Sequence, residues 1–106
     1  MNISKNDDWI IDAGDLVLEK RADGAELTEI ERLVYCLWVA DYSMKNAGDL
    51  EAAKDLYPNF MNEGFSIADK LKLKNSFQLF AKTQKDFESK YFEQFDLVCE
   101  EIKTQL

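Results

Sequence analysis

The sequence predicts an all-α fold: a single compact domain (residues 1–106) of five or six helices around a central apolar helix at about 29–46. Apolar residues recur at intervals of three and four along most of the chain, which is the spacing of one helix face. One proline and four glycines leave long stretches without a helix breaker, and no hairpin signal or internal repeat occurs. With 106 residues, of which 46% are hydrophobic, the chain is long enough for one core.

The first helix is expected from about residue 7 to residue 20, after Asn6 as its N-cap. Asparagine is a preferred N-cap residue, and the acids of the first turn complement the helix dipole. At about 100° per residue, the apolar side chains gather on one side and form the expected core-facing stripe. The residues of that stripe are Ile10, Ala13, Leu16 and Val17, with Trp9 at its edge.

The strongest helix signal begins at Thr28, three residues before Glu31. This spacing is a capping box, in which the threonine oxygen accepts from a backbone amide and the glutamate reaches back to the N-cap. The helix that it opens, at about 29–46, is apolar on most sides, which is typical of a helix surrounded by others. Gly48 is its expected end, because glycine readily adopts the left-handed conformation found at helix C-termini.

Four further segments complete the predicted bundle. Asp49 is expected to cap a short helix, and Pro58 suits the first turn of the helix after it. Gly64 lies inside that second helix and is a candidate kink. Thr83, three residues before an aspartate, resembles another capping arrangement. The segments are about 50–56, about 58–72, a short helix that starts at Asn75 or Ser76, and Thr83 to about Gln105.

One carboxylate interrupts the apolar face of the central helix. Asp41 follows Leu37 by four residues and Val34 by seven, so it projects from the same face. Burying an unpaired carboxylate is costly, so Asp41 must be paired, hydrogen-bonded or facing a cleft. The favoured interpretation is that Asp41 fixes the turn after its helix, with the amides of residues 47–50, Lys45 and a tyrosine hydroxyl as candidate donors. The alternative is a site residue that lines a pocket.

The same region resembles a known family. A Leu-Thr-x-x-Glu-Arg helix start, an apolar helix with a tryptophan, and then an acid and an Asn-x-Gly turn are similar to the DNA-mimic-protein-like (DMP-like) domain family. That family is largely of unknown function and is named for an acidic member that imitates the DNA duplex. A later stretch, Tyr91-Phe92-x-x-Phe95-Asp96, also resembles its closing helix. The likeness spans about residues 27–102, and the matching residues of its first part are Leu27, Thr28, Glu31, Arg32, Trp38, Asp41, Asn46 and Gly48.

The resemblance implies an all-α fold and favours a protein that is not an enzyme. It does not imply DNA mimicry, because most relatives have no assigned role. One departure affects the turn. Family members commonly read Asn-Gly-Gly followed by an aromatic or bulky residue, whereas this chain reads Asn46-Ala47-Gly48-Asp49. A function that depends on that aromatic residue is therefore not carried over to this chain.

Composition narrows the range of functions. The chain lacks histidine, which removes the usual general base near neutral pH, the commonest metal ligand and every Ser-His or Cys-His nucleophile. We therefore expect no enzyme, no cofactor and no metal site. The enzymatic alternative is a carboxylate-bound Mg²⁺ or Ca²⁺ ion, although no calcium-loop pattern occurs.

The expected compartment is the cytoplasm. The apolar runs are short, and the N-terminus lacks a signal-peptide stretch. Cys36 and Cys99 lie in apolar segments, so we expect two reduced, buried thiols, with a disulfide as the alternative. No membrane contact is expected.

The net charge of −8 favours a basic protein as partner, including a nucleic-acid-binding protein, and disfavours direct contact with nucleic acid. The acids gather on two helix faces. Their Cβ atoms, one helical turn apart, are separated by about 5–6 Å, which is near the phosphate spacing of a nucleic-acid strand. The alternative is a solvated face that only keeps the protein soluble. The candidate partner-binding residues are Asp8, Asp12, Asp15 and Glu19 on the first helix and Glu93, Asp96 and Glu100 on the last.

Overall fold

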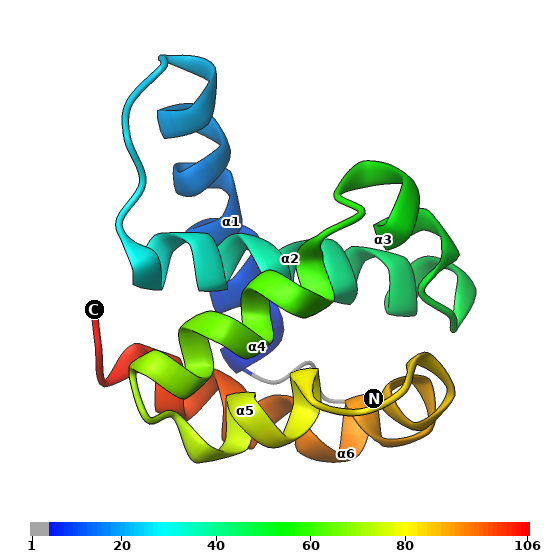
Figure 1. Cartoon of the computed structure of the whole chain (residues 1–106). Helices are drawn as coiled ribbons and strands as arrows, with labels where there is room; N and C mark the ends of the chain where they lie inside the picture. Colours follow the sequence, from blue (N-terminus) through cyan, green and yellow to red (C-terminus); the bar gives the residue numbers. More distant parts are fainter. Residues whose placement is uncertain (1–4) are drawn as a thin grey trace.

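The computed structural model describes residues 5–106 and places six α-helices and no strand in that range (Figure 1). The prediction of an all-α fold with five or six helices is confirmed. The radius of gyration of 12.6 Å is close to the value of about 13 Å for a compact domain of this length. The helices are α1 (Lys5–Ala22), α2 (Glu29–Ala47), α3 (Glu51–Leu56), α4 (Phe60–Lys70), α5 (Lys74–Phe80) and α6 (Gln84–Lys103).

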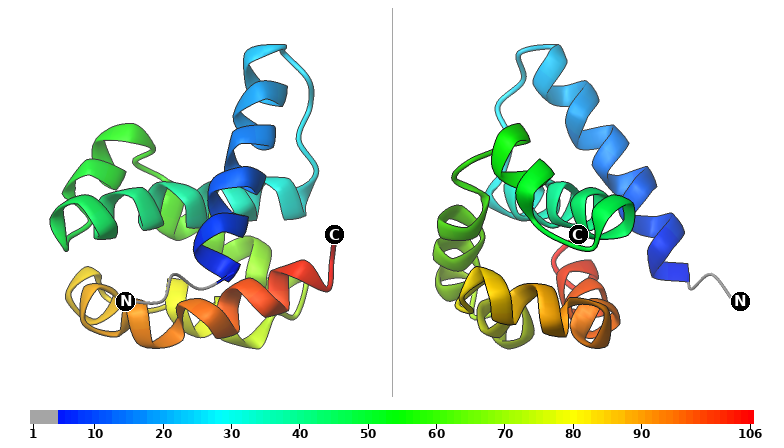
Figure 2. Two further views of the ribbon diagram at one scale, coloured as in Figure 1. Left: turned by 180° about the vertical axis from the view of Figure 1, so that it is seen from behind. Right: turned by 90° about the vertical axis from the view of Figure 1, so that its right-hand side faces the viewer.

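α2 is the central helix of the bundle, as the sequence predicts. It packs against α1, α3, α4 and α6, and most of its side chains are buried. In Figure 1, α4, α5 and α6 lie on one side of α2. Seen from behind in Figure 2, α1 crosses in front of α2, and its N-terminal end reaches α6. The C-terminal end of α1 and the connection at residues 23–28 form a protruding corner.

The contact between α1 and α2 depends on Gly14. A Cβ atom added to Gly14 would lie 2.1 Å from Cδ1 of Trp38, so the indole packs where only a glycine leaves room. This contact turns the buried face of α1 away from Leu16, which is 64% exposed. The prediction that Leu16 faces the core is therefore wrong. The buried residues of α1 are Asn6, Ile10, Gly14 and Val17.

The beginning of α1 also differs from the prediction. Asn6 lies within the helix and is buried, so it is not the N-cap. Its Nδ2 donates to Oδ1 of Asp96 at 2.9 Å, and its Oδ1 accepts from Nζ of Lys103. Both partners belong to α6. The buried asparagine therefore ties the first turn of α1 to the last helix.

Both predicted ends of α2 are confirmed. Oγ1 of Thr28 accepts from the amide of Glu31 at 3.3 Å. In return, Oε1 of Glu31 accepts from the amide of Thr28 at 2.9 Å, which completes the capping box. Gly48 has a φ of 74° and donates its amide to the carbonyl of Met44 at 2.8 Å. This left-handed residue ends the helix.

Two short helices receive their N-terminal caps from α6. The N-cap residues of α3 and α5, Leu50 and Leu73, make no side-chain capping bond, although Oδ1 of Asp49 accepts from the first amide of α3, that of Glu51, at 3.1 Å. Oε2 of Glu88 accepts from the amide of Leu50 at 2.8 Å. The carboxylate of Glu101 accepts from the amides of Asn75 and Ser76, each at 2.8 Å. A carboxylate is favoured at this position because helix N-termini present unpaired amides and a positive dipole end.

The remaining boundaries follow the predictions with small differences. α4 begins at Phe60, two residues after Pro58. Gly64 serves close packing, because an added Cβ atom would lie 2.6 Å from Cδ1 of Phe80. The glycine thus lets α5 approach α4, and the interpretation as a kink is replaced by this contact. Thr83 caps α6 as predicted, by accepting from the amide three residues further on.

Candidate functional site

Asp41 is a buried carboxylate that lies at the centre of a group of polar side chains. Its side chain is 5% exposed, and its Oδ2 lies 2.8 Å from Nζ of Lys45, one turn further along α2. Its Oδ1 accepts from the hydroxyl of Tyr91 at 2.6 Å. Nζ of Lys45 also lies 2.7 Å from Oδ1 of Asp7. We call these four residues the Asp41 cluster. It joins α2 to α6 through Tyr91 and to α1 through Asp7.

Burial and charge shift the pKa values of this cluster. Burial raises the pKa of Asp41, against the hydrogen bonds from Lys45 and Tyr91 that lower it. Burial lowers the pKa of Lys45, but hydrogen bonds to the two aspartates outweigh it and leave that pKa raised. Burial and the neighbouring Asp41 carboxylate raise the pKa of Tyr91 well above its usual value. Lys45 and Tyr91 therefore both hold their protons more tightly in the folded protein.

The contacts of Asp41 indicate a structural role. Each of its carboxylate oxygens has a donor, and its side chain is almost fully buried. The prediction that it is buried is confirmed, and of its candidate donors Lys45 and a tyrosine hydroxyl contact it. The prediction that it fixes the following turn is wrong, because Ser43 does so. The hydroxyl of Ser43 donates to the carbonyl of Asp49 at 2.6 Å and accepts from the amide of Ala53 at 3.2 Å.

The other residues of the predicted motif also make contacts within the fold. Nδ2 of Asn46 donates to the carbonyl of Tyr42 at 2.7 Å, and Gly48 ends α2 as described. Trp38 is half-buried, and its ring stacks between Tyr35 and Tyr42, at centroid distances of 6.1 and 5.9 Å. The turn thus forms without the glycine and the bulky residue that this chain lacks.

The predicted carboxylates of α1 share its outer face. All four are exposed, and none forms an ion pair with another of residues 5–106. Two cations at the end of the helix are engaged elsewhere. Lys20 pairs with Glu31, and the guanidinium of Arg21 lies 4.3 Å from the ring centroid of Tyr35. The acidic face of α1 comprises Asp8, Asp12, Asp15 and Glu19.

The predicted carboxylates of α6 are exposed but more engaged. Glu93 and Glu100 each pair with a lysine three residues away, at 3.5 and 3.2 Å. Asp96 accepts from Asn6, so the structure brings the α6 acids next to the first turn of α1. The two acidic faces therefore meet at one end only, and α1 carries the larger unpaired charge.

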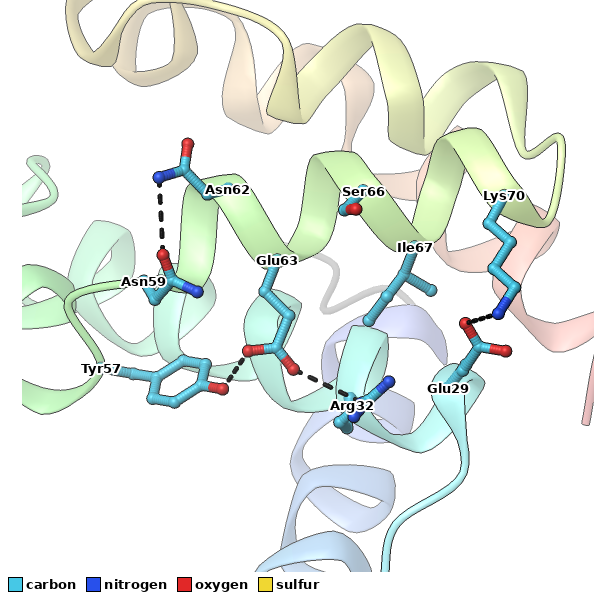
Figure 3. Close-up of a pocket in the computed structure, with 9 residues that line it drawn as sticks. All are labelled: Glu29, Arg32, Tyr57, Asn59, Asn62, Glu63, Ser66, Ile67 and Lys70. Atoms are coloured by element: carbon cyan, nitrogen blue, oxygen red, sulfur yellow. Dashed lines mark hydrogen bonds and ion pairs between the residues drawn. The ribbon is translucent and has the colours of Figure 1, made fainter.

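A polar groove of about 630 Å³ lies between α2 and α4 (Figure 3). Glu63 projects from α4 and accepts from the hydroxyl of Tyr57, while Nε of Arg32 lies 3.6 Å from its other oxygen. At the far end Lys70 pairs with Glu29 at 3.0 Å. Asn59, Asn62, Ser66 and Ile67 complete the lining.

The charged side chains of the groove neutralise one another in two pairs, Arg32 with Glu63 and Lys70 with Glu29. Burial, together with the hydrogen bond to Glu63, raises the pKa of Tyr57, so its phenol stays a neutral donor. Ser66, the one lining hydroxyl on an aliphatic side chain, has no hydrogen-bonded base in the described range. Sequence reasoning missed the groove, since its residues come from separate helices and follow no local pattern.

The two cysteines are buried, as predicted, and neither is bridged. Burial raises the pKa of both thiols, which makes them poor nucleophiles. Within residues 5–106, no three or more acidic or cysteine side chains come together in a way that suits a metal ion.

Comparisons with known proteins leave the family open. No family model, no curated protein and no solved structure matches the chain. Over the range that the structure describes, none of the helices has the length and apolar character needed to cross a membrane. The resemblance of residues 27–102 to the DMP-like family stays a prediction, and the function has to be argued from the residues themselves.

Proposed function

We propose that this chain is a small acidic protein-interaction domain that binds a basic partner protein through the acidic face of α1. The observation that carries the proposal is that these four carboxylates have no cation within residues 5–106. Like charges one turn apart cost a few tenths of a kcal/mol each, so the row weakens the fold slightly. A role outside the fold accounts for that cost.

The sharper form of the proposal is imitation of DNA, or neutralisation of a basic partner such as a nucleic-acid-binding protein. A net charge of −8 attracts a basic protein over a distance and speeds its association. The compartment that we propose is the cytoplasm, where both buried thiols stay reduced. We expect no catalytic activity, no cofactor and no direct contact with nucleic acid.

A second candidate is a structural or accessory domain whose acidity serves only solubility. The acids of α6 favour it, since two of the three pair with lysines of their own helix. A surface that neutralises itself keeps a protein soluble without selecting a partner. The two functions differ in whether the acidic face of α1 has a specific ligand.

Capture of partners from the native host at low and at moderate salt tests the proposal. Three baits are compared: the wild type, the variant Asp12→Asn/Asp15→Asn, and the control Glu93→Gln/Glu100→Gln. The control removes the same charge from α6. Basic proteins held by the wild type and the control, released by salt and lost with the α1 variant, are the expected result. Identical capture by all three baits would favour the solubility function.

A further inference from the structure

An apolar cleft borders the acidic face of α1. It has a volume of about 260 Å³ and lies between α1, α2 and Leu106. Leu16 is 64% and Leu106 65% exposed at its edge. Large apolar side chains that gather in an exposed hollow, rather than scattering singly, mark interaction sites. Apart from Asp12 and Glu31, the lining is apolar: Trp9, Ala13, Leu16, Val17, Val34 and Leu106.

The cleft and the acidic face are neighbours on the same helix. At 100° per residue, Leu16 points about 40° from Asp12 and about 120° from the buried Ile10. Asp12 belongs to both surfaces, because it lines the cleft and carries unpaired charge. On the far side Glu31 is neutralised by Lys20. The net charge at the rim is therefore negative on the side of the acidic face.

The walls of the cleft are held by the fold. Val17 and Val34 are core residues of α1 and α2, and Nζ of Lys103 lies 5.4 Å from the ring centroid of Trp9. A ligand that enters such a preformed hollow loses less free energy to ordering the protein. At about 260 Å³ the cleft is smaller than the roughly 300–1,000 Å³ of pockets for small molecules. Its size and lining suit a single large apolar side chain.

The negative charge of the acidic face determines which kind of molecule can supply that side chain. A second copy of this chain also carries a net charge of −8, so its overall charge opposes docking on the acidic face, as do the charges of nucleic acid and anionic membranes. A basic polypeptide is attracted. Binding sites commonly combine a central apolar anchor with a charged rim that keeps water out and sets the register. The cleft and its rim have this arrangement on a small scale.

We propose that the cleft and the acidic face of α1 form one docking surface for a basic segment of a partner protein. The segment places one large apolar side chain in the cleft and its flanking lysines or arginines against the four carboxylates. This inference rests on the proposed function and adds the anchor to it. A surface that recognises charge alone loses its ligand as salt rises, whereas an anchored segment keeps part of its affinity.

Two synthetic peptides test the anchor. They share the same lysines and arginines and differ at one central position, which is leucine in one and serine in the other. The leucine peptide should bind about tenfold more tightly, since a factor of ten corresponds to about 1.4 kcal/mol, less than the full burial of a leucine. Its advantage should persist at high salt. Its binding should also shift the indole NMR signal of Trp9, which a Trp9→Phe variant assigns.

A matched pair of variants localises the effect. Leu16→Gln removes a wall of the cleft at an exposed position and should abolish the preference for the leucine peptide while keeping affinity for the serine peptide. The control, Leu97→Gln, changes a leucine of similar exposure on α6 and should keep the preference. Asp12→Asn/Asp15→Asn should weaken both peptides.

The outcomes separate the two proposals. Equal binding of both peptides, weakened by the aspartate variant, would overturn the anchor and leave the acidic face as a binding surface. Failure of both peptides to bind at low salt would overturn both proposals. Self-association of the wild type that Leu16→Gln abolishes would make the cleft a contact between copies, and the docking proposal would fail.

Discussion

Asp7 and Asp8 are adjacent in α1, yet their surroundings are opposite. Asp7 lies 2.7 Å from Nζ of Lys45 and belongs to the Asp41 cluster. Asp8 is exposed and forms no ion pair with residues 5–106. A step of about 100° around the helix axis separates a carboxylate that the fold uses from one that it does not. The same contrast holds between the Asp41 cluster and the acidic face of α1 as a whole.

The contrast teaches that the environment of an acid, and not its type, decides what its removal changes. A carboxylate with buried donors contributes to the free energy of unfolding, because its loss leaves those donors unpaired. An exposed one contributes mainly to association with other molecules. Changes in the two regions should therefore separate into effects on stability and effects on binding.

The largest loss of stability is expected for Asp41→Ala. The substitution leaves the hydroxyl of Tyr91 without its acceptor and removes one of the two carboxylates that neutralise Lys45. We expect the free energy of unfolding to fall by about 3 kcal/mol, at the low end for breaking a buried pair, since Lys45 is partly exposed. Denaturant melts measure it. The control, Asp12→Ala, should cost less than about 0.5 kcal/mol, and equal losses would erase the contrast.

Gly14→Ala should come next, with a loss of about 2 kcal/mol, because the added methyl group collides with the indole of Trp38. This change tests whether the close approach of α1 and α2 holds the two faces of α1 in their orientations. In thermal or denaturant melts, combining it with Trp38→Leu should recover part of the loss, since the smaller side chain removes the collision. Full additivity of the two changes would contradict the assigned contact.

Alkaline pH should weaken the Asp41 cluster and spare the acidic face. The pKa of Lys45 is raised in the fold, so its stabilising contribution is complete below about pH 10 and is lost as the pH rises through the folded pKa. The pKa of Tyr91 is also raised, so above about pH 10 the unfolded chain gives up this proton first. Stability should fall by up to about 1.4 kcal/mol per pH unit for each group.

Denaturant melts from neutral pH to about pH 11 measure that slope. Tyr91→Phe removes one of the two titrating groups of the cluster and should flatten the curve, because Tyr57 and the two buried cysteines, whose pKa values are also raised, contribute equally to both proteins. The variant Asp12→Asn/Asp15→Asn should follow the wild-type curve. A wild-type curve without a downward slope would contradict the raised pKa values of the cluster.

The smallest effect is expected for Asp12→Asn/Asp15→Asn. Removing two like charges from an exposed row should leave stability unchanged or raise it by a few tenths of a kcal/mol. Asp7→Asn, the same chemical change on the other side of the helix, should lower stability because it weakens the contact with Lys45. Melts at low salt compare the two, and a rise for both would show that Asp7 is also surface charge.

The sequence was sufficient to predict the helices with strong local signals. The capping box at Thr28, the left-handed Gly48 and the cap at Thr83 act within a few residues of chain, so their geometry follows from their spacing. The burial of Asp41 was also predictable, since its position between apolar residues of one face requires a partner. Which tyrosine supplies that partner depends on how α6 docks, and no local pattern carries that information.

The orientation of α1 was not predictable from hydrophobicity. Gly14 and Asn6 are buried and Asp7 pairs with Lys45 of α2, but a pattern of apolar side chains gives these three residues no weight. The predicted stripe was therefore centred too close to Leu16. Because Leu16 was assigned to the core, the apolar cleft was not predicted. Leu16 lines this cleft and points closer to Asp12 than to the core. The polar groove at Glu63 was not predictable for a related reason, because its lining residues come from three separate elements.

The caps that α6 supplies have a consequence for the order in which the protein folds. α3 and α5 are short, and isolated helices of that length are unstable in water. The amides of Leu50, before α3, and of Asn75 and Ser76, in α5, obtain their side-chain acceptors only when Glu88 and Glu101 of α6 are in place. During synthesis, both helices leave the ribosome before the segment that caps them. We therefore expect α3 and α5 to consolidate last, with low φ-values for substitutions within them.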